Sequence, residues 1–233
     1  MFHPENKTLE LSKLLARETS GSVLLTESKK RDLRFSRFAL QWSVGAAVTT
    51  LLAWKLLPVR TDMPEQLRTA GFYLLTGLWL LSSLLMGHQF FGFAFPETGA
   101  NETSRRSIVR TRQLALLPLA VIGLISFSTI HFDDLTFQIY RDSHAFNGGC
   151  GMVIFVAGSI QAAFLYSWMK KGATTRQAEA GMWAALSTGA FTSFLISFAC
   201  QNEHPLHILI WHFLPLGGLA LLSGLVARKF LRW

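Results

Sequence analysis

The sequence predicts an all-α integral membrane protein with six transmembrane helices and both termini in the cytoplasm. Apolar residues make up 50% of the 233 residues and charged residues only 15%, whereas a soluble domain carries about 25% charged residues. The mean hydropathy is +0.32, yet the net charge is +8. A low charge content with a basic excess is typical of membrane proteins whose Lys and Arg residues lie in cytoplasmic loops. It fits a nucleic-acid-binding protein less well, because such a protein needs a basic face on a soluble fold.

Six segments of the chain are apolar enough to cross a bilayer, which takes about 20 mostly apolar residues. Charged residues, Pro, Gly or Asn interrupt the sequence between them. Membrane-spanning β-strands are excluded, because the segments are long and do not alternate between apolar and polar residues. The predicted spans are residues 38–58, 68–88, 113–130, 150–169, 178–199 and 207–227.

The distribution of basic residues predicts the orientation of these spans. Of the 22 Lys and Arg residues, 18 lie in the N-terminal segment, in the loops after the second and fourth spans, and at the C-terminus. The other three loops share only Arg60, Arg68 and Arg141. Because loops rich in Lys and Arg stay in the cytoplasm, we expect both termini there. The prediction divides the chain into a cytoplasmic segment, residues 1–36, and a six-helix transmembrane domain, residues 37–233.

The cytoplasmic segment contains a candidate for partner binding. Residues 8–19 fit a short amphipathic helix, in which Leu11, Leu14 and Leu15 form one apolar stripe. A helix of a dozen residues is marginal on its own. We therefore expect it either to dock on a partner protein or to lie on the inner leaflet of the membrane.

The chain has two cysteines, and the predicted topology places both at the outer face of the membrane. Cys150 opens the fourth span and Cys200 closes the fifth. The short turn between these spans, from Lys170 to Arg176, predicts an antiparallel hairpin whose outer ends are neighbours. The two thiols are therefore expected close together, on the side of a bacterial membrane where disulfides persist.

Two interpretations of this cysteine pair remain open. The pair can respond to oxidants or soft metals, with His144 and His204 as auxiliary metal ligands, or each cysteine can be a small apolar residue at a helix end. The spacing Cys200-x3-His204 suits a metal site but is a weak signal. His212 lies within the sixth span, and we expect no second histidine in the same layer, which argues against a haem site. The sequence therefore predicts no resident cofactor.

The last third of the sequence resembles the NrsF family of six-helix bacterial membrane anti-sigma factors. The resemblance extends from Cys150 to the C-terminus, and its most specific part is the Cys…Pro-Leu…Trp stretch. The chain departs from the family pattern at Gln201, where a proline is frequent. The matching residues are Lys170-Lys171-Gly172-Ala173, Ala180-Gly181, Cys200, Pro205-Leu206, Trp211 and Leu231-Arg232-Trp233.

The resemblance implies a regulatory function and no enzymatic activity. Family members hold an extracytoplasmic-function sigma factor inactive at the bacterial inner membrane and release it under stress. Cys150 and Cys200 occupy the positions of a family cysteine pair that is associated with sensing oxidants or heavy metals. The resemblance assigns sigma binding to the N-terminal segment, with Leu11, Leu14 and Leu15 as candidates. The expected partners are thus a sigma factor and membrane lipid, without direct contact to nucleic acid.

Two other functions are weaker alternatives. A membrane thiol oxidoreductase usually has a close pair such as Cys-x-x-Cys, which this sequence lacks. A small-molecule transporter or channel is expected to have charged residues along its pathway, and the second to sixth predicted spans contain almost none.

Overall fold

The computed structural model describes a helical protein, and among the described residues there is no strand. The chain divides into two compact units, residues 1–41 and 42–233, and the helical bundle below belongs to the second. The predicted helix 8–19, with Leu11, Leu14 and Leu15, lies outside the described residues. The structure describes residues 36–37, 39–52, 55, 59–94, 102–130, 149–169, 176–202 and 204–230.

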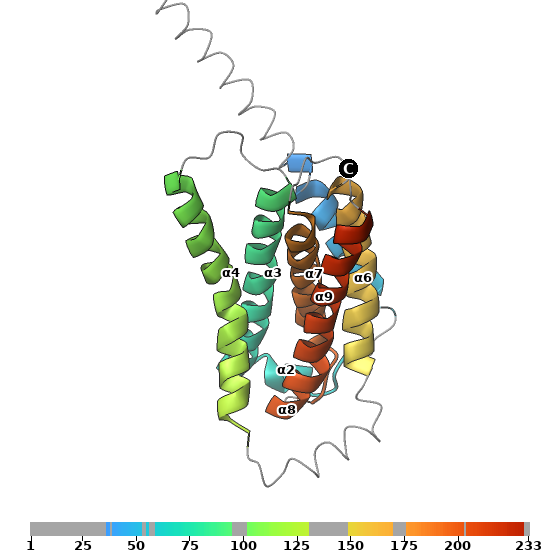
Figure 1. Cartoon of the computed structure of the whole chain (residues 1–233). Helices are drawn as coiled ribbons and strands as arrows, with labels where there is room; N and C mark the ends of the chain where they lie inside the picture. Colours follow the sequence, from blue (N-terminus) through green and yellow to red (C-terminus); the bar gives the residue numbers. More distant parts are fainter. Residues whose placement is uncertain are drawn as a thin grey trace, which may run out of the picture. The chain divides into compact units, whose positions relative to one another are not determined.

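Each of the six predicted spans coincides with a helix (Figure 1). The first is an apolar helix, Ala39–Leu52, and a single turn, α2, precedes the second. The sixth span begins with a short α-helical turn and a π-helix before it continues as α9. The helices are α2 (Met63–Gln66), α3 (Ala70–Ala94), α4 (Glu102–Ser128), α6 (Gly149–Met169), α7 (Gln177–Ile196), α8 (Pro205–His207), η2 (Ile208–Phe213) and α9 (Leu214–Phe230).

Four of these helical segments are long and apolar enough to cross a membrane: Ala70–Ala94, Thr111–Ser128, Gly149–Ser167 and Pro205–Phe230. The helix Ala39–Leu52 is shorter over its described residues. The remaining helix, α7, has the length of a span but carries many small and hydroxyl side chains. The structure therefore supports four of the six predicted spans, and the other two stay predictions, as does the position of the termini.

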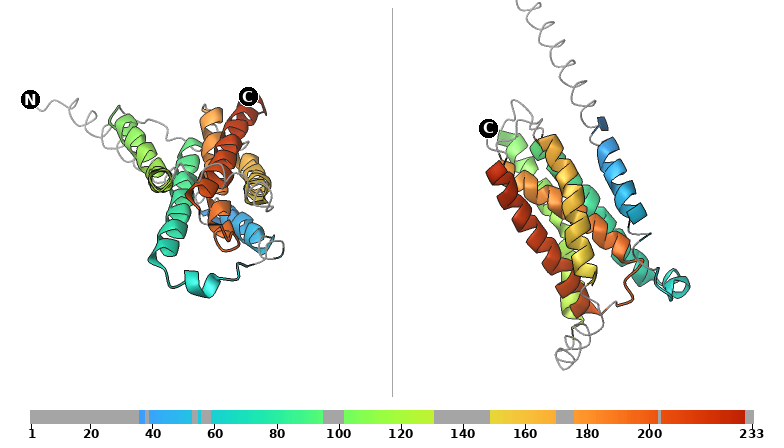
Figure 2. Two further views of the ribbon diagram at one scale, coloured as in Figure 1. Left: turned by 90° about the horizontal axis from the view of Figure 1, so that it is seen from below. Right: turned by 90° about the vertical axis from the view of Figure 1, so that its right-hand side faces the viewer.

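The composition of α7 follows from its central position. It packs against α3, α6 and α9, and most of its residues are buried, so few of its side chains face outward. Figure 2 shows these helices side by side in two views. The helices around α7 instead expose large apolar side chains, such as Leu124 on α4, Met152 on α6 and Leu225 on α9. Exposed apolar surface on this scale indicates lipid-facing helices, because soluble monomers rarely present large apolar patches.

Small residues let α7 and α9 approach closely. A Cβ atom added to Gly181 would lie 2.6 Å from the Cβ of Ala227 and 2.6 Å from the carbonyl oxygen of Ser223. Ala185 lies one helical turn further along and is buried in a cluster with Leu219 and Ala220. Gly181 and Ala185, two small residues four apart, thus let the two helices pack closely.

Buried hydroxyl groups tie α7 to its neighbours. The Ser83 hydroxyl donates to the carbonyl oxygen of Ser187 at 2.8 Å, and the Ser187 hydroxyl donates to the carbonyl oxygen of Ser83 at 2.8 Å. The Thr188 hydroxyl donates to the carbonyl oxygen of Gly158 on α6 at 3.1 Å. Such bonds average about 0.6 kcal/mol in a membrane protein, so they fix helix register more than they add stability.

Charged residues gather where α7 begins. Glu179 forms ion pairs with Arg176 and, at 3.5 Å, with Arg112 of α4. The guanidinium of Arg112 lies 4.5 Å from the ring centroid of Phe93, near the end of α3. This group, which we call the arginine cluster, lies at one end of the bundle, and the two cysteines lie at the other.

Candidate cysteine–histidine site

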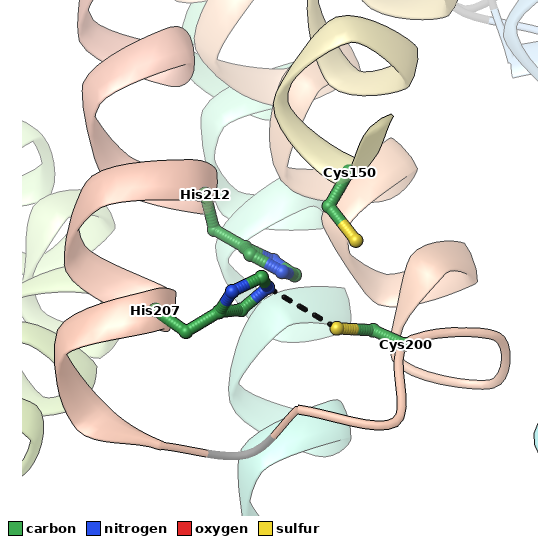
Figure 3. A group of neighbouring side chains, drawn as sticks. All are labelled: Cys150, Cys200, His207 and His212. Atoms are coloured by element: carbon green, nitrogen blue, oxygen red, sulfur yellow. Dashed lines mark hydrogen bonds between the residues drawn. The ribbon is translucent and has the colours of Figure 1, made fainter. Parts of the chain in front are cut away.

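Four side chains with metal-binding atoms meet at the end of the bundle opposite the arginine cluster: Cys150, Cys200, His207 and His212 (Figure 3). One ligand atom from each side chain lies within 4.8 Å of the others. The Sγ atom of Cys200 is 3.3 Å from the Nε2 atom of His207. The two imidazole rings are 5.7 Å apart between centroids. We call this group the Cys2His2 cluster.

The hairpin of α6 and α7 explains how the two cysteines meet. Cys150 lies in the first turn of α6, and Cys200 follows the last turn after α7, where its backbone N–H donates to the carbonyl oxygen of Ile196 at 2.7 Å. Because the two helices pack against each other along their length, their ends bring the two thiols together. The proximity that the sequence predicts is therefore found in the structure.

The chain then turns back and begins the sixth helical segment. The Nδ1 atom of His204 accepts the backbone N–H of Leu206 at 3.3 Å, and Pro205 stands in the first turn of α8. Proline is favoured in that position because its fixed φ suits a helix and it has no N–H to leave unpaired. These two residues set the start of the helix and so bring His207 back toward Cys200.

A π-helix aligns the two histidines of the Cys2His2 cluster. Residues five apart in an α-helix are separated by about 140° around the axis, given 3.6 residues per turn. His207 and His212 are five apart, but the turn between them is the π-helix η2, whose hydrogen bonds join residues i and i+5. Pro215 explains why this turn is not α-helical. In an α-helix, its ring would clash with the carbonyl group four residues earlier, here that of Trp211.

A glycine allows α6 to approach this turn. A Cβ atom on Gly151 would lie 3.0 Å from Cγ of Pro215 and 3.3 Å from the carbonyl oxygen of Trp211. The absence of a side chain at this position therefore lets the first turn of α6 lie against η2. The neighbouring residue, Cys150, is thereby held next to His212.

His212 has an unusual environment for a polar side chain. It is 4% exposed, and neither ring nitrogen has a hydrogen-bond partner in the described part of the chain. One side of the ring faces Trp79, with 6.1 Å between the ring centroids. An unpaired buried polar group typically costs about 1–3 kcal/mol, so this arrangement needs a compensating interaction or a functional reason.

The electrostatic surroundings favour a thiolate in the cluster. Hydrogen bonding with Cys150 is the largest effect on Cys200 and lowers the pKa of its thiol; burial opposes the change, and the nearby His207 and His212 support it. A cavity of about 20 Å³ adjoins Cys200 and His212 and is also lined by Arg60. The Arg60 guanidinium forms two 2.6 Å hydrogen bonds with the carboxylate of Asp62 and lowers the pKa of that carboxyl to about 2.

The histidines of the cluster differ from those that the sequence suggested. His204 is not part of the cluster, because its ring caps α8 instead. His144 lies outside the described residues. The expectation that no two histidines share a layer was wrong, since His207 and His212 are neighbours. Two sequence signals pointed to this pair: His207 follows Cys200 closely in the sequence, and Pro215 distorts the turn that carries both histidines.

Together, the fold and the cluster define a helical protein with membrane-compatible helices and a thiol–imidazole site at one end of its bundle. A family model described as negative regulator of sigma F matches residues 26–233. The chain therefore belongs to the NrsF family, whose name implies a sigma factor as partner. Comparisons with curated proteins and with solved structures found no match.

Proposed function

We propose that this protein is an anti-sigma factor of the bacterial inner membrane. In this proposal it binds an extracytoplasmic-function sigma factor at the cytoplasmic face, keeps it from RNA polymerase, and releases it when Cys150 and Cys200 are modified from the periplasm. The observation that carries the proposal is the family match over residues 26–233, which includes both cysteines. The protein acts by binding, without catalysis and without direct contact to DNA.

The distribution of charge supports the proposed orientation. The arginine cluster lies at the end of the bundle where α7 begins, and α9 brings Arg228 and Lys229 to its own C-terminal end. Figure 1 shows that the C-terminal end of α9 lies opposite α8, next to which the cysteines are found. With basic ends in the cytoplasm, the Cys2His2 cluster faces the periplasm.

The position of α7 supports a path for the signal. Glu179 in its first turn holds Arg112 and Arg176, and Cys200 follows its last turn. A helix of 20 residues spans about 30 Å, so one packed element connects the two ends of the bundle. In the proposal, a change at the cysteines shifts α7 against α3 and α9 and so lowers the affinity for sigma at the cytoplasmic face.

The proposed oxidant response is a change in the covalent state of the two thiols. A hydroperoxide accepts two electrons and two protons from the Cys150 and Cys200 thiols; the sulfurs join in a disulfide, and the peroxide leaves as water and an alcohol, or as two waters. The sulfur atoms, within 4.8 Å of one another, must then approach to about 2.05 Å. This movement draws α6 toward the turn after α7. A tenfold loss of sigma affinity needs about 1.4 kcal/mol of difference between the two states.

Co-purification from cells tests the proposal. The full-length protein carries an affinity tag at its C-terminus and is extracted from its own cells in detergent, and any co-purifying sigma factor is identified by mass spectrometry. We expect the sigma factor to co-purify from untreated cells and to be depleted after brief peroxide treatment. Absence of any sigma factor from the untreated sample would refute the proposed function.

The cysteine variants separate binding from sensing. Cys150→Ser and Cys200→Ser remove one thiol each and nearly preserve side-chain volume, so both variants should retain the sigma factor and lose the response to peroxide. Gly77→Ala, a change on α3 where nothing lies within 4 Å of the added Cβ, serves as the control and should respond like the unmodified protein. Release of sigma from both cysteine variants by peroxide would show that the thiols are not the sensor.

A further inference from the structure

The Cys2His2 cluster combines features that a pair of reactive thiols does not require. Its two histidines come from a separate element, α8–η2, and are buried, whereas the two cysteines are partly buried. His207 is 0% exposed and His212 is 4% exposed. Two redox-active thiols must be able to reach an oxidant and each other, whereas two additional buried imidazoles suit a coordinated ion.

We infer that Cys150, Cys200, His207 and His212 form a four-ligand site for a divalent ion with a filled d shell, Zn²⁺ or the chemically related Cd²⁺. Two thiolates with two imidazoles are a common donor set for structural zinc, which is bound by four ligands in a tetrahedron. The site itself is inferred from the geometry of the cluster, and its consequence for sigma release rests on the proposed function.

The distances within the cluster suit such an ion. Bond lengths of about 2.3 Å to sulfur and about 2.0–2.1 Å to nitrogen give ligand-to-ligand separations of roughly 3.3–3.8 Å in a tetrahedron. The Cys200 Sγ and His207 Nε2 atoms are already 3.3 Å apart. The largest separation in the cluster is no more than 4.8 Å, so closure requires shifts of about 1 Å, within reach of side-chain rotation.

The buried ring of His212 is an independent observation that points to a ligand. Both of its nitrogens lack a hydrogen-bond partner in the part of the chain that the structure describes, although the residue is only 4% exposed. In Figure 3 the ring points toward His207 and the two sulfur atoms. Coordination through one nitrogen would compensate for part of the cost of burying this polar ring.

The charges around the cluster are compatible with a bound dication. Two thiolates and two neutral imidazoles balance a charge of +2, so the occupied site has no net charge. Among the residues that line the cavity beside the cluster, Arg60 carries a positive charge, and it is paired with Asp62. The pair is neutral as a whole, which reduces repulsion between the guanidinium and the ion.

The inferred ion would connect three elements that the backbone leaves separate. Cys150 belongs to α6, Cys200 to the turn after α7, and both histidines to α8–η2. A tetrahedral ion holds all three elements at bonding distance from its centre, whereas loss or exchange of the ion frees them. Under the proposed function, the metal state of this site sets the position of α7 and hence the affinity for sigma.

Metal titration of the purified protein tests the site without sigma factor. The full-length chain is kept in detergent with its thiols reduced, depleted of metal with a chelator, and titrated first with Co²⁺ as a spectroscopic probe and then with Zn²⁺ or Cd²⁺ as competitors. We expect one ion per chain, the visible bands of tetrahedral Co²⁺, and a thiolate-to-metal charge-transfer band. Binding without tetrahedral bands would overturn the inference.

Histidine variants distinguish the four-ligand site from binding by thiols alone. His207→Gln and His212→Gln should each lower the affinity for Co²⁺ at least tenfold, and Cys150→Ser and Cys200→Ser should lower it further and reduce the charge-transfer band. The control is His88→Gln, an exposed residue of α3. Unchanged affinity in both cluster histidine variants, or an equal loss in the His88 variant, would overturn the assignment.

X-ray absorption spectroscopy on the zinc-loaded, unmodified protein counts the ligands directly. Because it uses no variant, its result does not depend on whether a variant folds. Two sulfur and two nitrogen neighbours are expected; four sulfur atoms or a shell of oxygen atoms would contradict the inference. These outcomes are separable from the proposed function. Metal binding without sigma capture would leave the site intact and refute the anti-sigma activity, and sigma capture without the histidine ligands would do the reverse.

Discussion

Single side chains decide the chemistry at the end of the bundle. His212 carries two ring nitrogens into a buried site where the described residues offer no hydrogen bond. The Cys200 thiol lies 3.3 Å from His207 and also donates to the carbonyl oxygen of Asn202 at 3.4 Å. A cluster of this kind gains stability when an ion replaces the missing interactions, and its residues contribute little to stability otherwise.

Replacing His212 by Phe separates stability from metal binding. In metal-free protein, His212→Phe removes two unpaired buried nitrogens and keeps a ring of similar size, so its free energy of unfolding should be equal or higher by up to about 1–3 kcal/mol. With Zn²⁺ at 100 times its dissociation constant, the unmodified protein should gain about 2.7 kcal/mol and the variant should gain less. Thermal unfolding in detergent, followed by circular dichroism, measures both. A destabilised metal-free variant would show that the ring is held by interactions other than a metal.

The helices determine where these side chains lie, and close packing is what positions them. α7 is surrounded by α3, α6 and α9 and owes its many small residues to that position. Gly181 and Gly151 mark two places where a neighbouring element comes within contact distance of the backbone. The first sets the distance between α7 and α9, and the second sets the distance between Cys150 and His212.

A side chain at Gly181 should separate α7 from α9. For Gly181→Val, the added Cβ would meet the Ala227 Cβ and the Ser223 carbonyl oxygen at 2.6 Å, so we expect a loss of about 1–3 kcal/mol in stability. Gly77→Ala on α3 is the control, because nothing lies within 4 Å of its added Cβ and the helix should gain about 0.5–1 kcal/mol. Midpoints of thermal unfolding compare the two, and equal effects would contradict the close approach.

A side chain at Gly151 should weaken the metal site more than the fold. Gly151→Val pushes the first turn of α6 away from Pro215 and Trp211, because its added Cβ would lie only 3.0–3.3 Å from their atoms, and so moves Cys150 away from His212. We expect at least a tenfold loss of Co²⁺ affinity with the helical content retained. Competition titration measures the affinity, with Gly77→Ala as the reference; equal affinities would show that α6 is positioned by other contacts.

For the whole molecule, the long helices and the meeting of the cysteines follow from sequence patterns, but the pairing of the histidines does not. A described helix coincides with each predicted apolar segment, and the short turn before Arg176 predicted that Cys150 and Cys200 meet. The pairing of His207 with His212 was missed because α-helical spacing places them on different faces. A π-helix before Pro215 reverses that expectation, and such a local change in helix type depends on tertiary packing as much as on the residues within the turn.

Reporter fusions test the orientation of the bundle. Green fluorescent protein attached after Trp233 should fluoresce, and alkaline phosphatase at the same position should be inactive, because the proposed orientation places this basic end in the cytoplasm. Alkaline phosphatase inserted between residues 131 and 148 should be active. The reverse pattern would place the Cys2His2 cluster on the cytoplasmic side and exclude a periplasmic signal.

Under the proposed function, the state of the Cys2His2 cluster at one end of the bundle changes the affinity for sigma at the other. One affinity measurement tests this connection. The full-length protein is placed in lipid nanodiscs with thiols reduced, and its dissociation constant for the cognate sigma factor is measured in the metal-free state and with one Cd²⁺ bound. We predict that the dissociation constants in these two states differ at least tenfold and that the difference disappears in Cys200→Ser. The same dissociation constant in both states of the unmodified protein would contradict it.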